Sequence, residues 1–458
     1  MHGRQGSGAP PRHTPFAALS ELTCVLVALS ATALAQTWEI EVVDSAGSVP
    51  NVGTYTSLAL DSAGGPHISY YGGGLRFASR DASGWHVEMA DTTGAAGQHS
   101  SLALDGAGAP HIGYYGSYHL KYACRTASGW HVETVDAALY VGKYASLALD
   151  TAGWPHISYW DWPNADLKHA WRDTSGWHLE IVDATGDVGY HTSLALDGEG
   201  WPHISYQAGT PEFDLKYGHR DASGWHIETV DATGFQGYHT SLDLDDSGFP
   251  HIAYGDMSTS DLRYARRDAL GWHIETADAM GDVGQYNSLA LDASGHPHIS
   301  YCRDASNSDL KHAWRDASGW HTEFVDGARA EYTSIALDRA GLPHISYHAD
   351  IGLRYAKFVS TGGETPLVEP MVIGLLSVSP NPFTSAISLT YSLPQPGAQH
   401  LALYDVLGRM IAVLKDGFSC EGTQQVTWSP KGVPAGAYLL RLSVDGTASA
   451  TQRVVYVR

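Results

Sequence analysis

The sequence predicts an all-β protein, a seven-bladed β-propeller followed by a small immunoglobulin-like β-sandwich. Three observations lead to this prediction. A unit of four short strands recurs through residues 36–358, the chain enters and leaves this repeat out of phase, and a different alternating pattern follows the repeat. Four strands in roughly 45 residues is typical of a propeller blade.

The repeat is marked by the triplet Pro-His-Ile, which occurs seven times at intervals of 44 to 48 residues. In the third unit, SLALD is followed by HISY, then by DLKHAWR (166–172) and WHLEIVD (177–183). These runs alternate with period two and are rich in β-branched and aromatic residues. Asp-x-x-Gly-x-Pro and Asp-x-Ser-Gly turns separate them. We therefore expect four antiparallel strands per unit.

The two ends of the repeat complement each other. A fourth-strand copy, WEIEVVD (38–44), precedes the first Pro-His-Ile, and the last unit stops after a third strand, LRYAKF (353–358). The N-terminal strand is therefore predicted to complete the seventh blade and close the ring. A linear solenoid would instead carry atypical capping repeats.

The recurring histidines favour a structural interpretation. Of 25 histidines, seven follow the proline of Pro-His-Ile and six follow the tryptophan of Trp-His. A catalytic histidine is needed once, whereas these occur in nearly every blade. The repeated turn aspartate is likewise predicted to accept hydrogen bonds from nearby backbone N–H groups. The sequence assigns no catalytic residue, no metal site and no cofactor.

One slot, at the start of each first strand, holds only tyrosine or histidine. Its seven members are predicted to surround the mouth of the central channel: Tyr55, His99, Tyr144, His191, His239, Tyr286 and Tyr332. The loops between second and third strands open on the same face and vary most, and one of them, WDWPNA (160–165), contributes Trp160 and Trp162. Two interpretations stay open for the ring: it binds a ligand, or it plugs the channel and braces the loops.

Aromatic faces with polar tips suit sugars, so the favoured function is non-enzymatic binding of a glycan or another surface ligand. An enzyme, either a polysaccharide lyase or a glycoside hydrolase, is the alternative. A structural surface protein without a small ligand is a third possibility. Catalysis requires a constellation that breaks the blade symmetry, and the sequence shows no convincing one.

The amino-acid composition excludes some classes of binding partner. The chain of 458 residues carries 49 acidic and 27 basic residues, a formal net charge of −22. Nucleic acid and anionic lipid surfaces are poor partners for such a chain, since both require clustered Lys and Arg. Outside the N-terminal segment, three widely spaced cysteines (Cys124, Cys302 and Cys420) give no disulfide framework.

Both ends carry signals. Residues 1–35 combine arginines, a short apolar run and the small-residue pattern Ala33-Leu34-Ala35, which predicts a secretory signal peptide cleaved before Gln36. No other segment is predicted to span a membrane. A linker (359–374) rich in Gly, Pro and Thr leads to residues 375–458, where alternating strands predict the β-sandwich.

Two resemblances add to this interpretation. The turn RDASGW (80–85, 220–225, 315–320) resembles the Asp-box of sialidase-like, or BNR, propellers, in which the box is structural. Thr126 and Leu270 depart from the pattern in two copies. BNR-type polysaccharide lyases are a weaker resemblance, and no residue matches a motif that would carry their catalysis over.

The C-terminal residues combine Pro-Asn-Pro-Phe (380–383), Tyr-Asp-x-x-Gly-Arg (404–409) and Gly-x-Tyr-x-x-Arg-Leu (436–442). They resemble the C-terminal sorting domain of the type IX secretion system. That resemblance implies a bacterial protein that is secreted or displayed on the outer cell surface, with the secretion machinery as a partner. An ordinary adhesive β-sandwich is the alternative interpretation.

Overall fold

The computed structural model describes residues 35–45, 47, 49–93, 95–303, 309–350, 352–361, 375–393, 397–405, 409–419, 422–430, 432–444 and 447–457. The predicted signal peptide up to Leu34, most of the predicted linker and Cys420 lie outside them. Every regular element in this part of the chain is a β-strand. The predicted fold class is confirmed, because residues 35–361 form seven antiparallel sheets of four strands each and the C-terminal strands form two further sheets.

The seven blades are numbered from the first Pro-His-Ile unit. Their first strands are β2 (Thr54–Leu60), β6 (Gln98–Leu104), β10 (Val141–Leu149), β14 (Val188–Leu196), β18 (Tyr238–Leu244), β22 (Val283–Leu291) and β26 (Glu331–Leu337). Their second strands are β3 (Pro66–Tyr71), β7 (Pro110–Gly116), β11 (Pro155–Asp161), β15 (Pro202–Ala208), β19 (Pro250–Asp256), β23 (Pro297–Arg303) and β27 (Pro343–Ala349). Each first strand contacts those of the two adjacent blades, and β2 contacts β26, which closes the circle.

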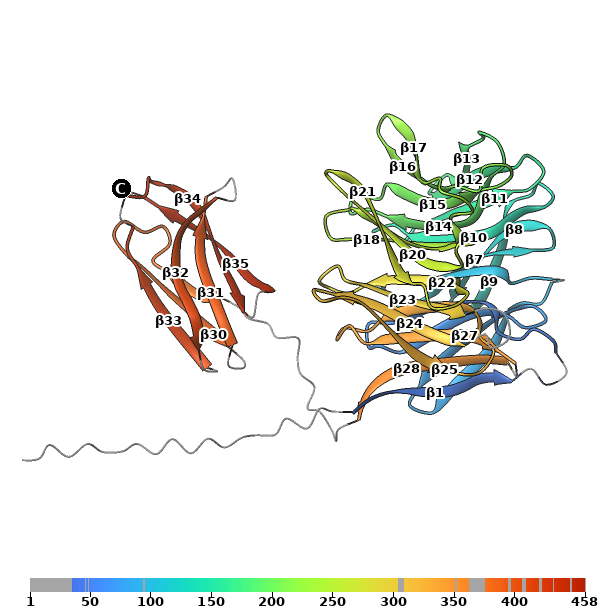
Figure 1. Cartoon of the computed structure of the whole chain (residues 1–458), viewed down its shortest axis with the longest axis horizontal. Helices are drawn as coiled ribbons and strands as arrows, with labels where there is room; N and C mark the ends of the chain where they lie inside the picture. Colours follow the sequence, from blue (N-terminus) through green and yellow to red (C-terminus); the bar gives the residue numbers. More distant parts are fainter. Residues whose placement is uncertain are drawn as a thin grey trace, which may run out of the picture.

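The outer half of each blade follows the same order. The third strands are β4 (Leu75–Asp81), β8 (His119–Thr126), β12 (Asp166–Asp173), β16 (Leu215–Asp221), β20 (Asp261–Asp268), β24 (Leu310–Asp316) and β28 (Gly352–Thr361). The fourth strands are β5 (Gly84–Asp91), β9 (Gly129–Asp136), β13 (Gly176–Asp183), β17 (Gly224–Asp231), β21 (Gly271–Asp278), β25 (Gly319–Asp326) and β1 (Ala35–Ser45). Blade 7 thus takes its outer strand from the start of the chain, as Figure 1 shows where β1 runs beside β28.

A ring of seven serines joins the blades near the axis. In each first strand, the serine of the Ser-Leu or Ser-Ile pair accepts a hydrogen bond from a backbone N–H of the next blade. For example, Ser146 Oγ accepts from Leu194 N at 3.0 Å. The other six acceptors are Ser57, Ser101, Ser193, Ser241, Ser288 and Ser334. Each of these serines therefore bonds the adjacent blade.

The rim is joined by the repeated tryptophan and arginine. Trp85 lies edge-on to Tyr355 of the preceding blade, with ring centroids 5.3 Å apart. Its Nε1 donates to Glu41 at 2.8 Å, and Arg80 Nε donates to the same carboxylate at 3.0 Å. These contacts bridge blades 1 and 7, so the recurrent arginine at the third-strand end serves blade packing.

The Pro-His-Ile histidines bond within their own blades. In blade 2, His111 Nε2 lies 3.6 Å from the turn residue Asp105, and its Nδ1 contacts the Tyr122 hydroxyl. In blade 3, His156 Nδ1 instead lies 3.2 Å from Nε2 of His169. The turn aspartate behaves as predicted, since Asp150 Oδ1 accepts from the N–H groups of Ala152 and Trp154. These contacts support the structural interpretation.

The C-terminal strands form a sandwich of two sheets. One sheet holds β29 (Leu375–Ser379), β30 (Ile387–Leu393) and β33 (Gly422–Trp428), and the other holds β32 (Met410–Ser419), β31 (Gly397–Tyr404), β34 (Gly436–Val444) and β35 (Thr447–Tyr456). Phe383, Leu389, Leu403, Leu440 and Val454 are buried in the core between them.

Two of the C-terminal sequence motifs make hydrogen bonds that hold this domain together. Asn381 donates to the carbonyl of Arg453 and accepts from Val455 N, which fixes β35. Arg409 Nε donates to Asp405 at 2.8 Å across the turn between β31 and β32.

Candidate functional site

The seven predicted channel-mouth residues form one closed ring of aromatic contacts. Each ring lies 4.3 to 4.7 Å, centroid to centroid, from its two neighbours, from the Tyr55–His99 pair round to Tyr332–Tyr55. The sequence placed these residues in one slot from the period of the repeat alone. The structure brings all seven of them together.

Backbone geometry explains how each side chain reaches the axis. All seven ring residues have positive φ, from 49° for His239 and Tyr286 to 56° for Tyr55 and Tyr144. Each lies within a bulge where the register between first and second strand shifts, as between Lys143 and Ser146. A left-handed conformation is uncommon for residues other than glycine and costs of order 1 kcal/mol or more. Its occurrence in all seven blades means that the fold holds the ring in place against strain.

The ring lines a small open cavity of about 170 Å³. Its wall consists of the ring and the residue that follows each ring member: Thr56, Ser100, Ala145, Thr192, Thr240, Asn287 and Thr333. Five of these hydroxyls bond a second-strand serine of the preceding blade, as Thr240 does with Ser205 at 2.9 Å. Ala145 and Asn287 are the exceptions, and they face blades in which Gly113 and Ala253 replace that serine. The buried Oδ1 of Asn287 has no hydrogen-bond partner in the part of the chain that the structure describes.

The ring histidines are held neutral. Burial lowers the pKa of His99 and of His191 to about 3, and it lowers that of His239 well below its ordinary value. His239 Nδ1 accepts a hydrogen bond from Tyr286 N at 3.0 Å, which places any ring proton on Nε2. The ring presents neutral imidazoles and phenols to a ligand at neutral pH.

The two predicted tryptophans differ in position. Trp160 lies near the end of β11 and not in a loop, because β11 continues two residues past Tyr159 and pairs Trp160 with Lys143. It is only 5 % exposed. Trp162, in the turn that follows, is 50 % exposed. The assignment of Trp160 to the loop was therefore wrong, and only Trp162 offers an open ring face.

Sequence reasoning missed two exposed tyrosines beside Trp162. Tyr140 lies edge-on to Trp162 at 5.4 Å and to Tyr118 at 5.1 Å, and these three side chains are 40 to 57 % exposed. We call Tyr118, Tyr140 and Trp162 the aromatic platform. It adjoins the ring through Trp160, whose ring centroid is 6.3 Å from Trp162 and 6.0 Å from Tyr144. A series of aromatic contacts through the buried Trp160 thus connects the platform to the ring.

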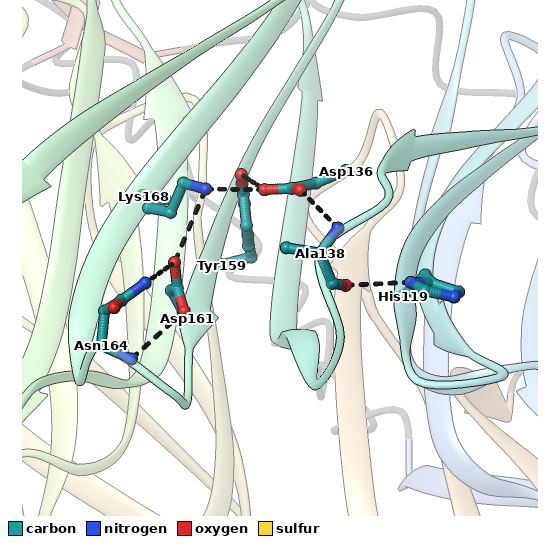
Figure 2. A network of polar contacts seen from close by, with 7 residues as sticks. All are labelled: His119, Asp136, Ala138, Tyr159, Asp161, Asn164 and Lys168. Carbon is teal, nitrogen blue, oxygen red and sulfur yellow. Dashed lines mark hydrogen bonds and ion pairs between the residues drawn. The ribbon is translucent and has the colours of Figure 1, made fainter.

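A polar network braces the junction of blades 2 and 3, next in sequence to the platform residues (Figure 2). Asp136, at the end of β9, accepts from Tyr159 at 2.8 Å and from Lys168 at 2.6 Å, both in the next blade. Asp161 lies 3.6 Å from the same ammonium and accepts from Asn164 at 3.0 Å. Burial opposes the charge of Asp136, but the bonds from Lys168, the Ala138 N–H and Tyr159 hold the pKa of its carboxyl below the ordinary value. A tyrosine bonds the equivalent aspartate between every pair of adjacent blades.

We expect Asp136→Ala to lower the free energy of unfolding by about 2–4 kcal/mol, because it leaves the buried Tyr159 hydroxyl unpaired and leaves the Lys168 ammonium with only the more distant Asp161 carboxylate. Urea denaturation at pH 7.5, followed by tryptophan fluorescence, measures the change. Glu199→Ala, in an exposed turn, is the control and is expected to leave stability unchanged. Equal midpoints for the two variants would contradict the bracing role.

The described residues show neither a metal-ligand cluster nor a membrane-spanning helix. No three His, Cys, Asp or Glu side chains gather there as a metal ion would need. No helix there is long and apolar enough to cross a membrane. Among the described residues, neither Cys124 nor Cys302 takes part in a disulfide bond.

Comparison with known proteins identifies the C-terminal domain. Residues 377–457 match the family of secretion system C-terminal sorting domains. The domain therefore implies handling by the type IX secretion system, and with it export to the cell surface or release, as in Bacteroidetes. A search of curated proteins gave no match to the chain.

Solved structures that resemble the chain do so at low identity. A triple-arginine mutant of AofleA from Arthrobotrys oligospora is 12 % identical over 72 % of this chain and 94 % of its own, with a TM-score of 0.46. A PL25 ulvan lyase with a bound saccharide is 14 % identical over 70 % and 96 %, with a TM-score of 0.47. A protein of unknown function from Dyadobacter fermentans is 10 % identical over 57 % and 94 %, with a TM-score of 0.43.

Proposed function

We propose that the propeller is a non-enzymatic glycan-binding module, exported through its sorting domain and displayed on the cell surface or released. The predicted signal peptide would take the chain across the inner membrane before the sorting domain acts. The binding site is the aromatic platform together with the mouth of the ring.

The observation that carries this proposal is the exposure of three large aromatic side chains beside a rigid ring. Exposed aromatic residues that cluster together mark interaction sites. Sugar rings present apolar C–H patches, which pack on aromatic faces, and hydroxyls, which bond polar tips such as the phenols of Tyr118 and Tyr140. Because the neighbouring backbone is fixed by the ring, little ordering entropy is lost on binding.

Binding is favoured over catalysis because the described part of the platform combines aromatic residues with a single ammonium, that of Lys143, and lacks a paired acid and base. Incubation of each bound polysaccharide with the protein, followed by measurement of reducing ends and of absorbance at 235 nm, distinguishes binding from hydrolysis and from lyase cleavage. Either product at a steady rate would replace the binding proposal by the enzyme alternative.

We expect Trp162→Ala to weaken binding of a polysaccharide ligand at least tenfold, about 1.4 kcal/mol, since hot-spot aromatic residues commonly cost more than 1 kcal/mol when truncated. Affinity electrophoresis against a panel of polysaccharides, then calorimetry on those that bind, measures the loss. Phe324→Ala removes an equally exposed aromatic residue from the outer strand β25 and serves as the control. Equal affinity in both variants would place the site elsewhere, and no binding to any polysaccharide would refute the proposed function.

A further inference from the structure

Lys143 breaks the symmetry of the ring at the platform. It directly precedes the ring residue Tyr144. The same position in the other blades holds Thr54, Gln98, Tyr190, Tyr238, Gln285 and Glu331. Blade 3 is therefore the only blade that places a cation beside the channel mouth at this position.

Aromatic side chains hold the ammonium of Lys143. Its Nζ lies 4.6 Å from the ring centroid of Trp162 and 5.9 Å from those of Trp160 and Tyr115. Ring faces attract a cation and fix its position, but they do not neutralise its charge. The ammonium is thus positioned against the half-exposed Trp162 ring with its charge intact.

The other lysines of the propeller are used differently. Lys121, Lys168, Lys216, Lys311 and Lys357 each contact a carboxylate. Lys143 has no hydrogen bond or ion pair with any residue that the structure describes. In a chain with 49 acidic residues, a half-buried ammonium surrounded by aromatic rings and without a carboxylate has its charge available to a ligand.

We infer that the ligand is an anionic polysaccharide whose negative group, a uronate carboxylate or a sulfate ester, pairs with Lys143 while its sugar ring stacks on Trp162. This inference rests on the proposed function and specifies its ligand class. A charged group on an aromatic-lined site also gives orientation, because the anion fixes which end of a sugar unit faces the channel mouth.

The net charge of −22 does not oppose this pairing at short range. At physiological ionic strength the Debye length is about 8 Å, so carboxylates on distant blades are largely screened. The Lys143 ammonium would lie in direct contact with the anion, where screening is weakest. Added salt should still weaken binding, because a single ion pair at a partly exposed site remains sensitive to it.

The test compares charged and neutral forms of the same backbone with the full mature protein. Polygalacturonate is matched with its methyl ester, and dextran sulfate with dextran, so the two arms separate a carboxylate ligand from a sulfate ligand. We expect one charged polymer to bind at least tenfold more tightly than its neutral partner. Lys143→Gln should remove that difference while leaving the affinity for the neutral form and the melting temperature unchanged.

Lys357→Gln, which removes a lysine paired with Glu39 on the outer strands, is the control and should bind as the parent does. Equal binding of charged and neutral polymers by the parent protein, or full preference retained in Lys143→Gln, would overturn the inference and leave the glycan-binding function standing. Failure of every polymer to bind would instead refute both.

Discussion

Removal of Trp38 to Asp44 is expected to unfold the propeller and not merely to fray one blade. β1 pairs with β28 along its whole length, from Ala35 opposite Thr361 to Ser45 opposite Gly352. Without it, β28 becomes an edge strand with a row of unpaired backbone groups. The first and last blades also lose part of the contact that closes the circle.

Side chains of β1 reach both neighbouring blades, which is why the expected effect is large. Asp44 accepts from Tyr70 at 2.6 Å and from Arg76 at 2.7 Å, and Glu41 accepts from Trp85, all in blade 1. Trp38 lies edge-on to His312 of blade 6 at 5.7 Å. Loss of these groups leaves buried polar partners unpaired. The summed loss of free energy is comparable to the roughly 5–15 kcal/mol that stabilises a typical domain.

A circular permutant provides the matched control. Because Ala35 lies opposite Thr361, a short turn can join residue 361 to residue 35, so that β1 follows β28 as the fourth strand follows the third in the other blades. Thermal melting by circular dichroism, with size-exclusion chromatography, compares residues 36–361, the deletion and the permutant. The permutant should melt cooperatively near the parent, and the deletion should not. A deletion that melts like the parent would refute closure by β1.

The repeat explains why so much of the ring could be predicted from the sequence. Seven copies of one unit must place equivalent residues at equivalent distances from the axis. The ring residues Tyr55, His99 and their equivalents could therefore be assigned from the sequence alone. The alternation of each run likewise predicted the strands. Nothing in the repeat indicated the positive φ of these residues, which comes from the bulge and is fixed by tertiary packing.

What the sequence did not reveal lies where the blades differ. Tyr118 and Tyr140 belong to non-repeating connections of blades 2 and 3, and only the packing of one blade on the next brings them to Trp162. Trp160 was misplaced because β11 runs two residues past the Tyr159 of HISY, so that Trp160 still pairs with Lys143 inside the hairpin. One available signal was overlooked: Lys143 stands out as soon as the residues preceding the ring slot are aligned.

Acidification is expected to destabilise the propeller from about pH 6.5 downward, and the ring histidines are a main cause. Burial lowers the pKa of His99 and His191 to about 3 and that of His239 well below 6.5. The groups around them are ring tyrosines, other ring histidines and Lys143, and none of these is a carboxylate that could pair with an imidazolium. Protonation inside the folded ring is therefore strongly disfavoured.

Proton linkage determines the direction in which the free energy of unfolding changes with pH. Below pH 6.5 the unfolded chain binds protons on these histidines while the folded chain does not, so the free energy of unfolding falls as the pH falls. Each histidine contributes up to about 1.4 kcal/mol per pH unit between its unfolded and folded pKa values. The aspartates held below their ordinary pKa, such as Asp136 and Asp183, act in the same direction but only below about pH 4. The window from pH 6.5 to 4.5 therefore reports mainly on histidines.

The residues found in this slot suggest a variant that separates the effect of the ring histidines from that of the other titrating groups. Tyrosine occupies it in four blades, so the triple change His99→Tyr, His191→Tyr and His239→Tyr keeps an aromatic ring at every position and removes the titration. It also removes the Tyr286 N–H bond to His239, which lowers stability equally at every pH and leaves the slope unaffected. Urea denaturation at pH 7.5, 6.5, 5.5 and 4.5 gives the free energy of unfolding of both proteins. The parent should lose stability with a slope that is steeper by about 2–4 kcal/mol per pH unit than that of the triple variant. A residual slope should remain in the variant, because burial also lowers the pKa of Pro-His-Ile histidines such as His156 and His203. Parallel stability curves for the two proteins would show that the ring histidines are not the buried neutral groups inferred here, and the ring would then have to admit water or an anion beside them.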